Sequence, residues 1–411
     1  MLRVSLFLIS FFILNSVFGQ KSHKIWGKVV DSKSQEPLSN VSIYIKDGNR
    51  GTFTNDQGYF IFSLENKIDT VIFQRIGFRP YQLTFENDYE ALVIHLDPDP
   101  FFLDEITVKA DSSLQIMTEA FARIKENYPN KQYLIKGYYR ESVLRDTQYV
   151  RFLDAAIGIN DFSYRSDPLR RKIEVYNLRK SEDFVEEDLL TKMVSLFFKE
   201  ENDFLISLNW RDILRRYHRE PSYFKGMNTD LLDFFDFKMD SVFNNGMEPV
   251  AKISFSAPTS MFSTNGFFLV NLSDFGVMSI EVTRVPTDRF SPDVFLKNAM
   301  TSVSVVEYRK VNDRYYLSRF FSQGTENFAA IDTDTESGAQ ILKMELWVNE
   351  VFDNKRFFDK VKNKNKLEWE TELKDLDIPY DPEFWKSFNF IPDSLEYRKM
   401  VRDLEKLKSN E

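Results

Sequence analysis

Residues 40–64 read NVSIYIKDGNRGTFTNDQGYFIFSL, and this stretch decides the fold class of the first part of the chain. Apolar residues alternate with other residues in two bursts, Val41 to Ile45 and Phe60 to Leu64, which is the period of a strand with one buried face. Gly48 and Gly58 lie in Asp- or Asn-containing turns that favour tight reversals. The stretch therefore predicts short strands joined by turns, not helices.

The same pattern extends on both sides of this stretch, from Lys24 to Asp97. Val71 to Phe73 and Leu92 to Leu96 repeat the alternation. Roughly seven strands fit into this length, which leaves no room for helices between them. Residues 20–97 are therefore predicted to form an antiparallel β-sandwich domain.

Four motifs in this region occur in an order that resembles the carboxypeptidase-regulatory-like domain family: Gly27 to Asp31, Glu36 to Ile43, Gly51 to Phe60, and Arg75 to Phe78. The resemblance implies a transthyretin-like fold of a kind that is abundant in the cell envelopes of Bacteroidetes. Each motif also has a local physical role, since Gly58, for example, closes a hairpin. These positions identify a scaffold and do not name a ligand.

The N-terminus has the pattern of a secretory signal peptide. Arg3 precedes an apolar run from Val4 to Phe18, and Gly19 supplies the small residue of a cleavage site. The run is shorter than the roughly 20 residues that a spanning helix requires. We expect residues 1–19 to be removed, with an uncleaved anchor as the alternative. The mature chain is then expected to have no transmembrane segment and to lie in the periplasm or on the periplasmic face of the outer membrane.

The end of the first domain is expected at Asp97-Pro98-Asp99-Pro100, because proline lacks the amide that a strand ladder needs. We place a linker at residues 98–112, an α+β domain at 113–352 and a helical segment at 353–411. The whole chain is therefore predicted to be mainly β, or α+β. A larger domain with a long-stranded antiparallel sheet and flanking helices follows the sandwich.

Long strands dominate the expected second domain, without the helix after every strand that marks a parallel α/β fold. A helix with Leu114, Met117, Phe121 and Ile124 on one face precedes them and ends at Tyr128. The expected strands are Gly137–Ser142, Tyr149–Ile159, Val250–Phe255, Gly266–Leu272, Val277–Val285, Ser302–Lys310, Arg314–Ser322 and Gln340–Val351.

Three further helices are expected. One covers Glu182–Glu200 with Ser181 as its N-cap, a short one is capped by Asp381, and a longer one is capped by Asp393. Pro382 suits the first position of the short helix. The apolar stripe of the last helix, which is expected to pack on the second domain, is Tyr397, Met400, Val401, Leu404 and Leu407.

Three further resemblances concern the chain after the sandwich. Leu103 to Ala110 resembles the segment that joins such a domain to the plug of TonB-dependent outer-membrane receptors. Only 301 residues follow Ala110 (411 minus 110), too few for a barrel of that class. Asn265 to Glu281 and Tyr308 to Leu317 resemble the C-terminal regions of envelope proteins that carry the sandwich domain. The style of these strands also resembles the curved sheets of lipoprotein carriers.

The composition excludes several classes of function. The chain has no cysteine, which removes disulfides, thiolate zinc sites, iron–sulfur clusters and cysteine nucleophiles. A net charge of -9 argues against nucleic acid as a partner. His23, His95 and His218 show no zinc-ligand spacing, and no nucleophile elbow accompanies His218. Asp274 to Gly276 has the sequence of the kinase Asp-Phe-Gly motif by chance and is expected to form a turn.

Carboxylates remain as candidates for glycoside hydrolysis, which needs two acids across a cleft. Glu141 and Asp154 lie on expected strands. The alternative to a catalytic role is that they form ion pairs with Arg140 or Arg151 on the strand faces. Acids alternate in residues 332–338 as in a calcium loop, but the segment lacks glycine at the sixth place and the distal Glu of an EF-hand. We therefore assign no catalytic, cofactor-binding or metal-binding residue.

The chain has an excess of aromatic residues, with 40 Phe, 18 Tyr and 5 Trp. An ordinary core explains them, and a concave sheet that shelters an acyl chain is the alternative. We expect a non-enzymatic, exported cell-envelope protein in which the sandwich is a binding or docking module. Its second domain is expected to contact an envelope protein, a glycan or a lipid, without a cofactor. A carrier of an apolar lipid or acyl ligand and a carboxylate-dependent hydrolase are the alternatives.

Overall fold

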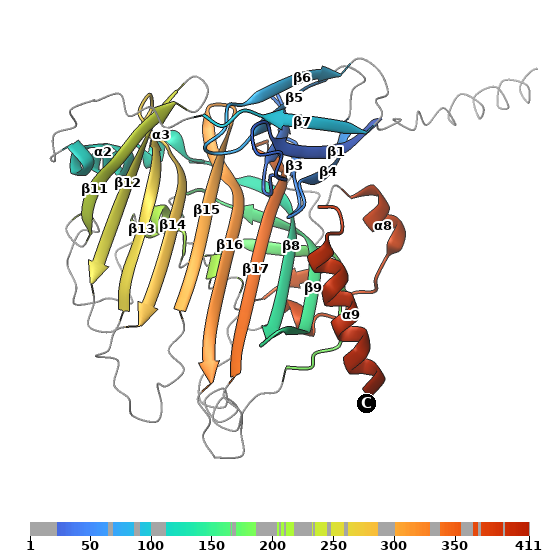
Figure 1. The fold of residues 1–411 in the computed structure, drawn as a ribbon. Helices are drawn as coiled ribbons and strands as arrows, with labels where there is room; N and C mark the ends of the chain where they lie inside the picture. The colour runs from blue at the N-terminus through green and yellow to red at the C-terminus, as the bar shows by residue number, and fades with distance from the viewer. Residues whose placement is uncertain are drawn as a thin grey trace, which may run out of the picture.

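The computed structural model describes most of the chain from residue 23 to residue 410 (Figure 1). The expected signal peptide, His218 and residues 332–337 of the calcium-like loop lie outside the described residues. The segments left out are 1–22, 65–68, 86–90, 100–111, 165, 167–169, 186–203, 205–206, 209–210, 218–231, 233–234, 245–247, 259–261, 287–300, 329–337, 355–364, 369–370, 389–390 and 411.

Seven short strands form the N-terminal sandwich, as the alternation predicts. One sheet has the order β4-β1-β7 and the other has the order β3-β2-β5-β6. Aliphatic and phenylalanine side chains, among them Val29, Ile43, Phe62 and Phe73, pack between the two sheets. The strands are β1 (His23–Asp31), β2 (Ser42–Ile45), β3 (Gly51–Phe53), β4 (Tyr59–Leu64), β5 (Asp69–Gln74), β6 (Tyr81–Phe85) and β7 (Leu92–Leu96).

One pair of strands in the sandwich departs from the antiparallel prediction. β7 runs parallel to β1, with Gly27 opposite Leu92. The chain enters β7 from β6, which belongs to the other sheet, so no tight hairpin fixes the direction of this pair. Glycine is required at position 27 because a Cβ there would collide with the Leu92 carbonyl oxygen.

A single 11-stranded sheet forms the larger domain, in the order β11-β12-β13-β14-β15-β16-β17-β8-β9-β10-β18. Its neighbouring strands pair antiparallel throughout, which confirms the predicted long-stranded sheet. The strands are β8 (Tyr133–Arg145), β9 (Gln148–Asp161), β10 (Lys172–Lys180), β11 (Asp236–Asn244), β12 (Pro249–Pro258), β13 (Phe262–Asn271), β14 (Val277–Pro286), β15 (Thr301–Val311), β16 (Arg314–Phe328), β17 (Gly338–Phe352) and β18 (Lys366–Leu367).

Each strand expected after Gly137 is present, and most are longer than the sequence pattern indicated. β8 and β9 are joined across Asp146 and Thr147, and Asp146 takes a left-handed backbone conformation with a φ of 52°. The structure adds β10, β11 and β18, which the pattern did not reveal. β11 alternates only partly buried and exposed residues over most of its length, so its apolar signal in the sequence is weak.

Short helices cover one face of the large sheet, which we call the inner face. They are α2 (Ser112–Ala122), α3 (Ile124–Asn127) and α6 (Ile213–Tyr217). Met117, Phe121 and Ile124 join the main core there, as expected. Leu114 does not, since its side chain is 48% exposed and the neighbouring Ser113 is buried instead. The prediction of the apolar stripe was therefore wrong at its first position.

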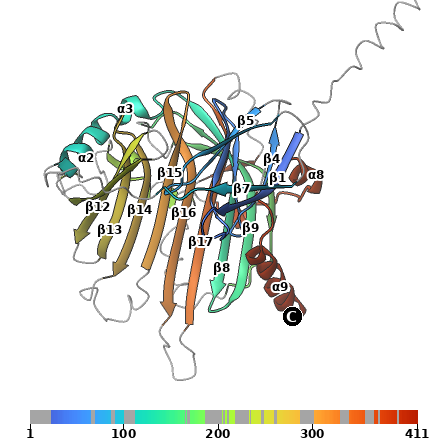
Figure 2. The same cartoon turned by 45° about the horizontal axis from the view of Figure 1, so that its top comes forward.

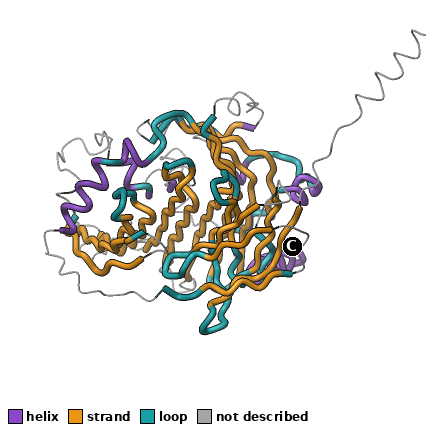
Figure 3. The backbone as a smooth tube through the Cα atoms, turned by 90° about the horizontal axis from the view of Figure 1, so that it is seen from above, coloured by secondary structure: helices purple, strands orange, loops and turns teal. Residues whose placement is uncertain are grey.

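The sandwich and the C-terminal helices lie on the opposite face, which we call the outer face (Figures 1 and 2). Phe53 of β3 packs there with Tyr138, Trp347 and Trp385. Seen from above, strands make up most of the molecule and the helices lie at its margins (Figure 3). The C-terminal elements are η5 (Leu373–Asp375), α8 (Pro382–Ser387) and α9 (Leu395–Asn410).

The capping predictions have mixed outcomes. Asp381 caps α8, with its carboxylate accepting from the amides of residues 383 and 384, as predicted. The cap of α9 is Ser394, not Asp393, because the Ser394 hydroxyl accepts the Tyr397 amide at 3.1 Å while Asp393 pairs with Arg179. Met400 and Leu404 of α9 pack on Tyr149 and Phe152.

The helix expected at Glu182–Glu200 does not begin where the sequence indicated. Residues 181–185 are not helical, and the remainder from residue 186 lies outside the described residues. The Ser181 hydroxyl accepts the amide of Phe152 at 3.1 Å. Ser181 therefore continues the contact of β10 with β9 and is not an N-cap.

Candidate functional site

The two acids that the sequence offered for hydrolysis lie on opposite faces of the large sheet. Glu141 shares the inner face with Tyr139, which belongs to the main core. Asp154 pairs with Arg140, the residue before Glu141 on β8. Because neighbouring residues of a strand point to opposite faces, Asp154 and Arg140 lie on the outer face. Two carboxylates separated by a sheet cannot flank one glycosidic bond. This pair therefore does not form the site of a hydrolase.

Arginines neutralise both acids. Arg140 Nε lies 2.9 Å from Asp154, Arg179 approaches the same carboxylate at 2.6 Å, and Arg151 lies 2.9 Å from Glu141. Burial alone would raise the pKa of Asp154, but the Arg140 and Arg179 guanidiniums hold it below its ordinary value. The geometry matches the ion pairs expected on strand faces, which is a structural role.

The remaining sequence candidates do not converge either. His23 begins β1 and His95 lies on β7. Asp274 to Gly276 forms the turn between β13 and β14, as expected, and Asp274 pairs with Lys310 at 2.6 Å. Within the described ranges, no group of three or more His, Asp or Glu side chains could hold a metal ion.

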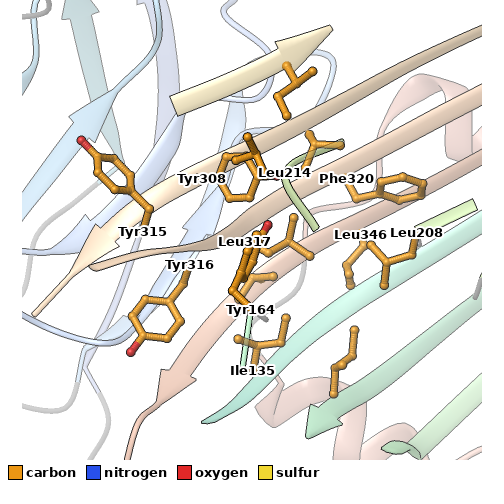
Figure 4. Packing of buried hydrophobic residues seen from close by; sticks show 14 of the residues in the cluster. Ile135, Tyr164, Leu208, Leu214, Tyr308, Tyr315, Tyr316, Leu317, Phe320 and Leu346 are labelled. Carbon is orange, nitrogen blue, oxygen red and sulfur yellow. The ribbon is translucent and has the colours of Figure 1, made fainter. Parts of the chain in front are cut away.

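The inner face is packed with aromatic side chains around a buried ion-pair network. The hydroxyls of Tyr164 and Tyr308 donate to Asp212 at 2.5 and 2.7 Å. Arg215 contacts both Asp212 and Asp161. Figure 4 shows Tyr164 and Tyr308 within this packing, where their ring centroids lie 6.2 Å apart. Where the structure describes them, these side chains form a packed core.

A polar hollow opens at the surface beside α3. Its volume is about 640 Å³, and it is lined by Lys125, Glu126, Asn130, Ser163 and Ser166. A pocket for an acyl chain needs mainly apolar walls. This hollow therefore does not support a lipid carrier.

The sandwich carries the most prominent exposed apolar surface among the described residues. Trp26 is 51% exposed, Tyr59 45%, Ile61 37% and Val93 60%. They come from the three strands of the sheet β4-β1-β7: Trp26 pairs with Ile61, and Lys28 pairs with both Tyr59 and Val93. We call this group the exposed apolar face. Contiguous apolar residues on a surface mark sites of interaction more often than single ones do.

The charged residues that share this face are basic. Lys24 and Lys28 alternate with Trp26 along β1. The Lys28 ammonium lies 5.5 Å from the centre of the Tyr59 ring. The outward positions of these three strands carry no acid, although the chain has an excess of acidic residues. The exposed apolar face is therefore locally positive on an acidic protein.

The sequence contains part of the signal for this face. The alternation that buries Phe60 and Phe62 also places Tyr59 and Ile61 on the other side of β4. Single apolar residues on a surface are ordinary, but an aromatic and an aliphatic residue at neighbouring outward positions of one strand indicate an apolar patch. Which residues of β1 and β7 join them depends on the strand order, which the sequence does not give.

Comparison with known families identifies the N-terminal domain. Residues 25–108 match the model of the CarboxypepD_reg-like domain, which confirms the resemblance seen in the four sequence motifs. The match extends beyond residue 97, where the sequence placed the end of the domain, and covers about a fifth of the chain. No curated protein sequence matches the chain. No helix among the described residues is long and apolar enough to cross a membrane.

Three solved structures show a distant likeness. A DUF1329 family protein from Desulfovibrio piger has 7% identity and a TM-score of 0.23, over 60% of this chain and 94% of that chain. Lipovitellin has 6% identity and a TM-score of 0.24, over 57% and 26%. A membrane-associated protein of unknown function from Bacteroides fragilis has 9% identity and a TM-score of 0.15, over 81% and 99%. These scores are too low to support an argument about fold or function.

Proposed function

We propose that this chain is a non-enzymatic, exported envelope protein that docks on an anionic lipid surface through the exposed apolar face of its sandwich. The observation that carries the proposal is the joint presence of Trp26, Tyr59, Ile61 and Val93 with Lys24 and Lys28 on one sheet. The periplasmic leaflet of the outer membrane is the surface that fits the expected export.

The chemistry of the face suits the boundary between lipid and water. Tryptophan and tyrosine favour this boundary because their rings are apolar on one side and can hydrogen-bond on the other. Each lysine near an anionic leaflet adds about 1 kcal/mol of attraction. Trp26 and Lys28 lie on the same strand and the same side, so both effects act together.

The position of the sandwich supports the same role. Its other sheet contacts the outer face of the large sheet through Phe53, and Trp347 donates to the Asn40 side chain at 3.2 Å. The exposed apolar face belongs to the sheet that does not make these contacts. The large domain thus holds the sandwich while this face remains available to a partner.

Co-sedimentation with lipid vesicles tests the proposal. We expect the mature protein to bind vesicles that contain phosphatidylglycerol more strongly than phosphatidylcholine vesicles, with weaker binding at high salt. Trp26→Ala should lower the partition coefficient by about tenfold, because the indole loses its burial in the lipid boundary. Tyr380→Ala is the matched control, since Tyr380 is 54% exposed outside the sandwich.

Three results would contradict this function. Equal partitioning of the wild type and Trp26→Ala would remove the role of the exposed apolar face. Strong binding to a purified glycan or protein without vesicle binding would replace the lipid partner. Turnover of a peptide or glycan substrate that is lost in Asp154→Asn or Glu141→Gln would make the protein an enzyme.

A further inference from the structure

Arg309 is a buried arginine at the junction of the two domains, where β2 and β3 of the sandwich meet β15–β17 of the large sheet. Only 8% of the residue is exposed. Both terminal nitrogens, Nη1 and Nη2, are sealed from solvent and have no hydrogen-bond partner within the described structure. The guanidinium lies 5.2 Å from the centre of the Tyr44 ring and against the backbone of Gly51.

The acids at the junction are paired with other cations. Glu350 lies 2.9 Å from Arg50 and 3.8 Å from Lys136. Glu307, two residues before Arg309 on the same strand, lies 3.4 Å from Arg319. Burial lowers the pKa of Arg309 to about 10, and Tyr44 is the group that opposes this shift. Arg309 therefore remains charged at neutral pH, and no carboxylate among the described residues balances it.

Other arginines buried in the sheet are balanced. Arg140 has Asp154 at 2.9 Å, and Arg215 contacts both Asp161 and Asp212. A buried charge is costly unless it is paired and hydrogen-bonded. Among the buried arginines of the described residues, Arg309 is the exception, since Arg140, Arg151, Arg215 and Arg319 each contact a carboxylate. Two further polar atoms at the junction, Ser42 Oγ and Asn349 Oδ1, also have no partner among the described residues.

We propose that the junction is an oxyanion site, in which a phosphate or carboxylate group accepts both Nη donors of Arg309. The planar guanidinium matches two oxygens of either group in a bidentate arrangement. Because both nitrogens are sealed where the sandwich meets the large sheet, an anion reaches them only if the contact between the two domains opens. The anion then balances the charge and stabilises the contact between the domains.

Thermal unfolding of the full mature chain in phosphate, acetate and chloride of equal ionic strength tests this site. Phosphate stabilises many proteins by exclusion from their surfaces, so the informative quantity is the difference between wild type and variant. We expect the Tm of the wild type to rise with phosphate or acetate relative to chloride, and the Tm of Arg309→Met to show a smaller rise. A response to phosphate alone identifies a phosphate ligand, and a response to acetate identifies a carboxylate.

The same variant makes a second, unusual prediction. In chloride, Arg309→Met should be at least as stable as the wild type, because replacing an unbalanced buried charge by an apolar side chain is often neutral or stabilising. Arg50→Met is the matched control at the junction and should keep the oxyanion response. An equal response of wild type and Arg309→Met, or no response of the wild type to either oxyanion, would overturn the site.

Calorimetric titration of the wild type with inorganic phosphate and with acetate keeps the test independent of whether Arg309→Met folds. Heat that saturates at one anion per chain supports the site. The absence of saturable heat with both anions counts against it.

Discussion

The two sheets of the sandwich differ in what covers their outward faces. The sheet β3-β2-β5-β6 places Phe53 in a cluster with Tyr138, Trp347 and Trp385 of the large domain, where Phe53 is 1% exposed. The sheet β4-β1-β7 leaves Trp26 51% exposed. A single small domain thus has one outward face that attaches it and another that remains open. This difference is the reason that we propose docking through the second face.

The largest effect is expected from breaking the attached face. Phe53→Ala should lower the free energy of unfolding by about 3–5 kcal/mol, because it removes a buried ring and leaves a cavity between the domains. Denaturant unfolding measures this change. Tyr59→Ala, on the open face, is the matched control and should change stability by no more than about 0.5 kcal/mol. Equal losses in the two variants would contradict the distinction between the faces.

The next largest loss of stability is expected from the buried ion pairs on the outer face of the large sheet. Asp154→Asn should lower the free energy of unfolding by about 3 kcal/mol at neutral pH, because Arg140 and Arg179 lose the carboxylate that balances them. Arg309→Met, which removes an unbalanced arginine, should show no such loss. A neutral effect of Asp154→Asn would mean that these ion pairs do not stabilise the fold.

Because Asp154 is a titratable group, the stability of the protein should depend on pH. The pKa of Asp154 is lower in the folded protein than its ordinary value of about 3.9, so its contribution is present above that value and is lost as the pH falls through the folded pKa. Acid titration of unfolding should therefore be less steep below about pH 4 in Asp154→Asn than in the wild type. Identical slopes would show that Asp154 is not the titrating group.

The smallest effect on stability is expected on the open face. Trp26→Ala and Ile61→Ala should each change the free energy of unfolding by no more than about 0.5 kcal/mol. Thermal unfolding monitored by circular dichroism measures this. A loss of several kcal/mol would mean that these side chains are part of the core and do not form a docking surface.

The sequence predicted the strands well because their alternation is local. Val277–Val285 and Arg314–Ser322 were recognised from their own residues; the first is one residue short of its strand and the second is six residues short. The same local pattern put Tyr59 and Ile61 outward from Phe60 and Phe62. A local pattern does not predict which residues pack on an outward face. The residues that bury Phe53 lie about 85 to 330 positions later in the chain.

The sequence indicated Arg140 and Arg151 as partners for the buried acids Asp154 and Glu141, but it did not indicate which buried arginine has no carboxylate beside it. Arg140 and Arg309 both lie on apolar strands, yet the first meets Asp154 across β8 and β9 while the second faces Tyr44 of the sandwich. This difference depends on strand register and on where the sandwich sits. The cap of α9 differed from the prediction by one residue because Asp393 found a partner in Arg179.

The fluorescence of Trp26 on membrane vesicles tests the central claim most directly. The signal of this residue is the difference between the emission of the wild type and that of Trp26→Phe. The docking account predicts that this emission shifts to shorter wavelength when phosphatidylglycerol vesicles are added, and that it does not shift with phosphatidylcholine vesicles. An emission that stays unchanged on both vesicles would contradict the account.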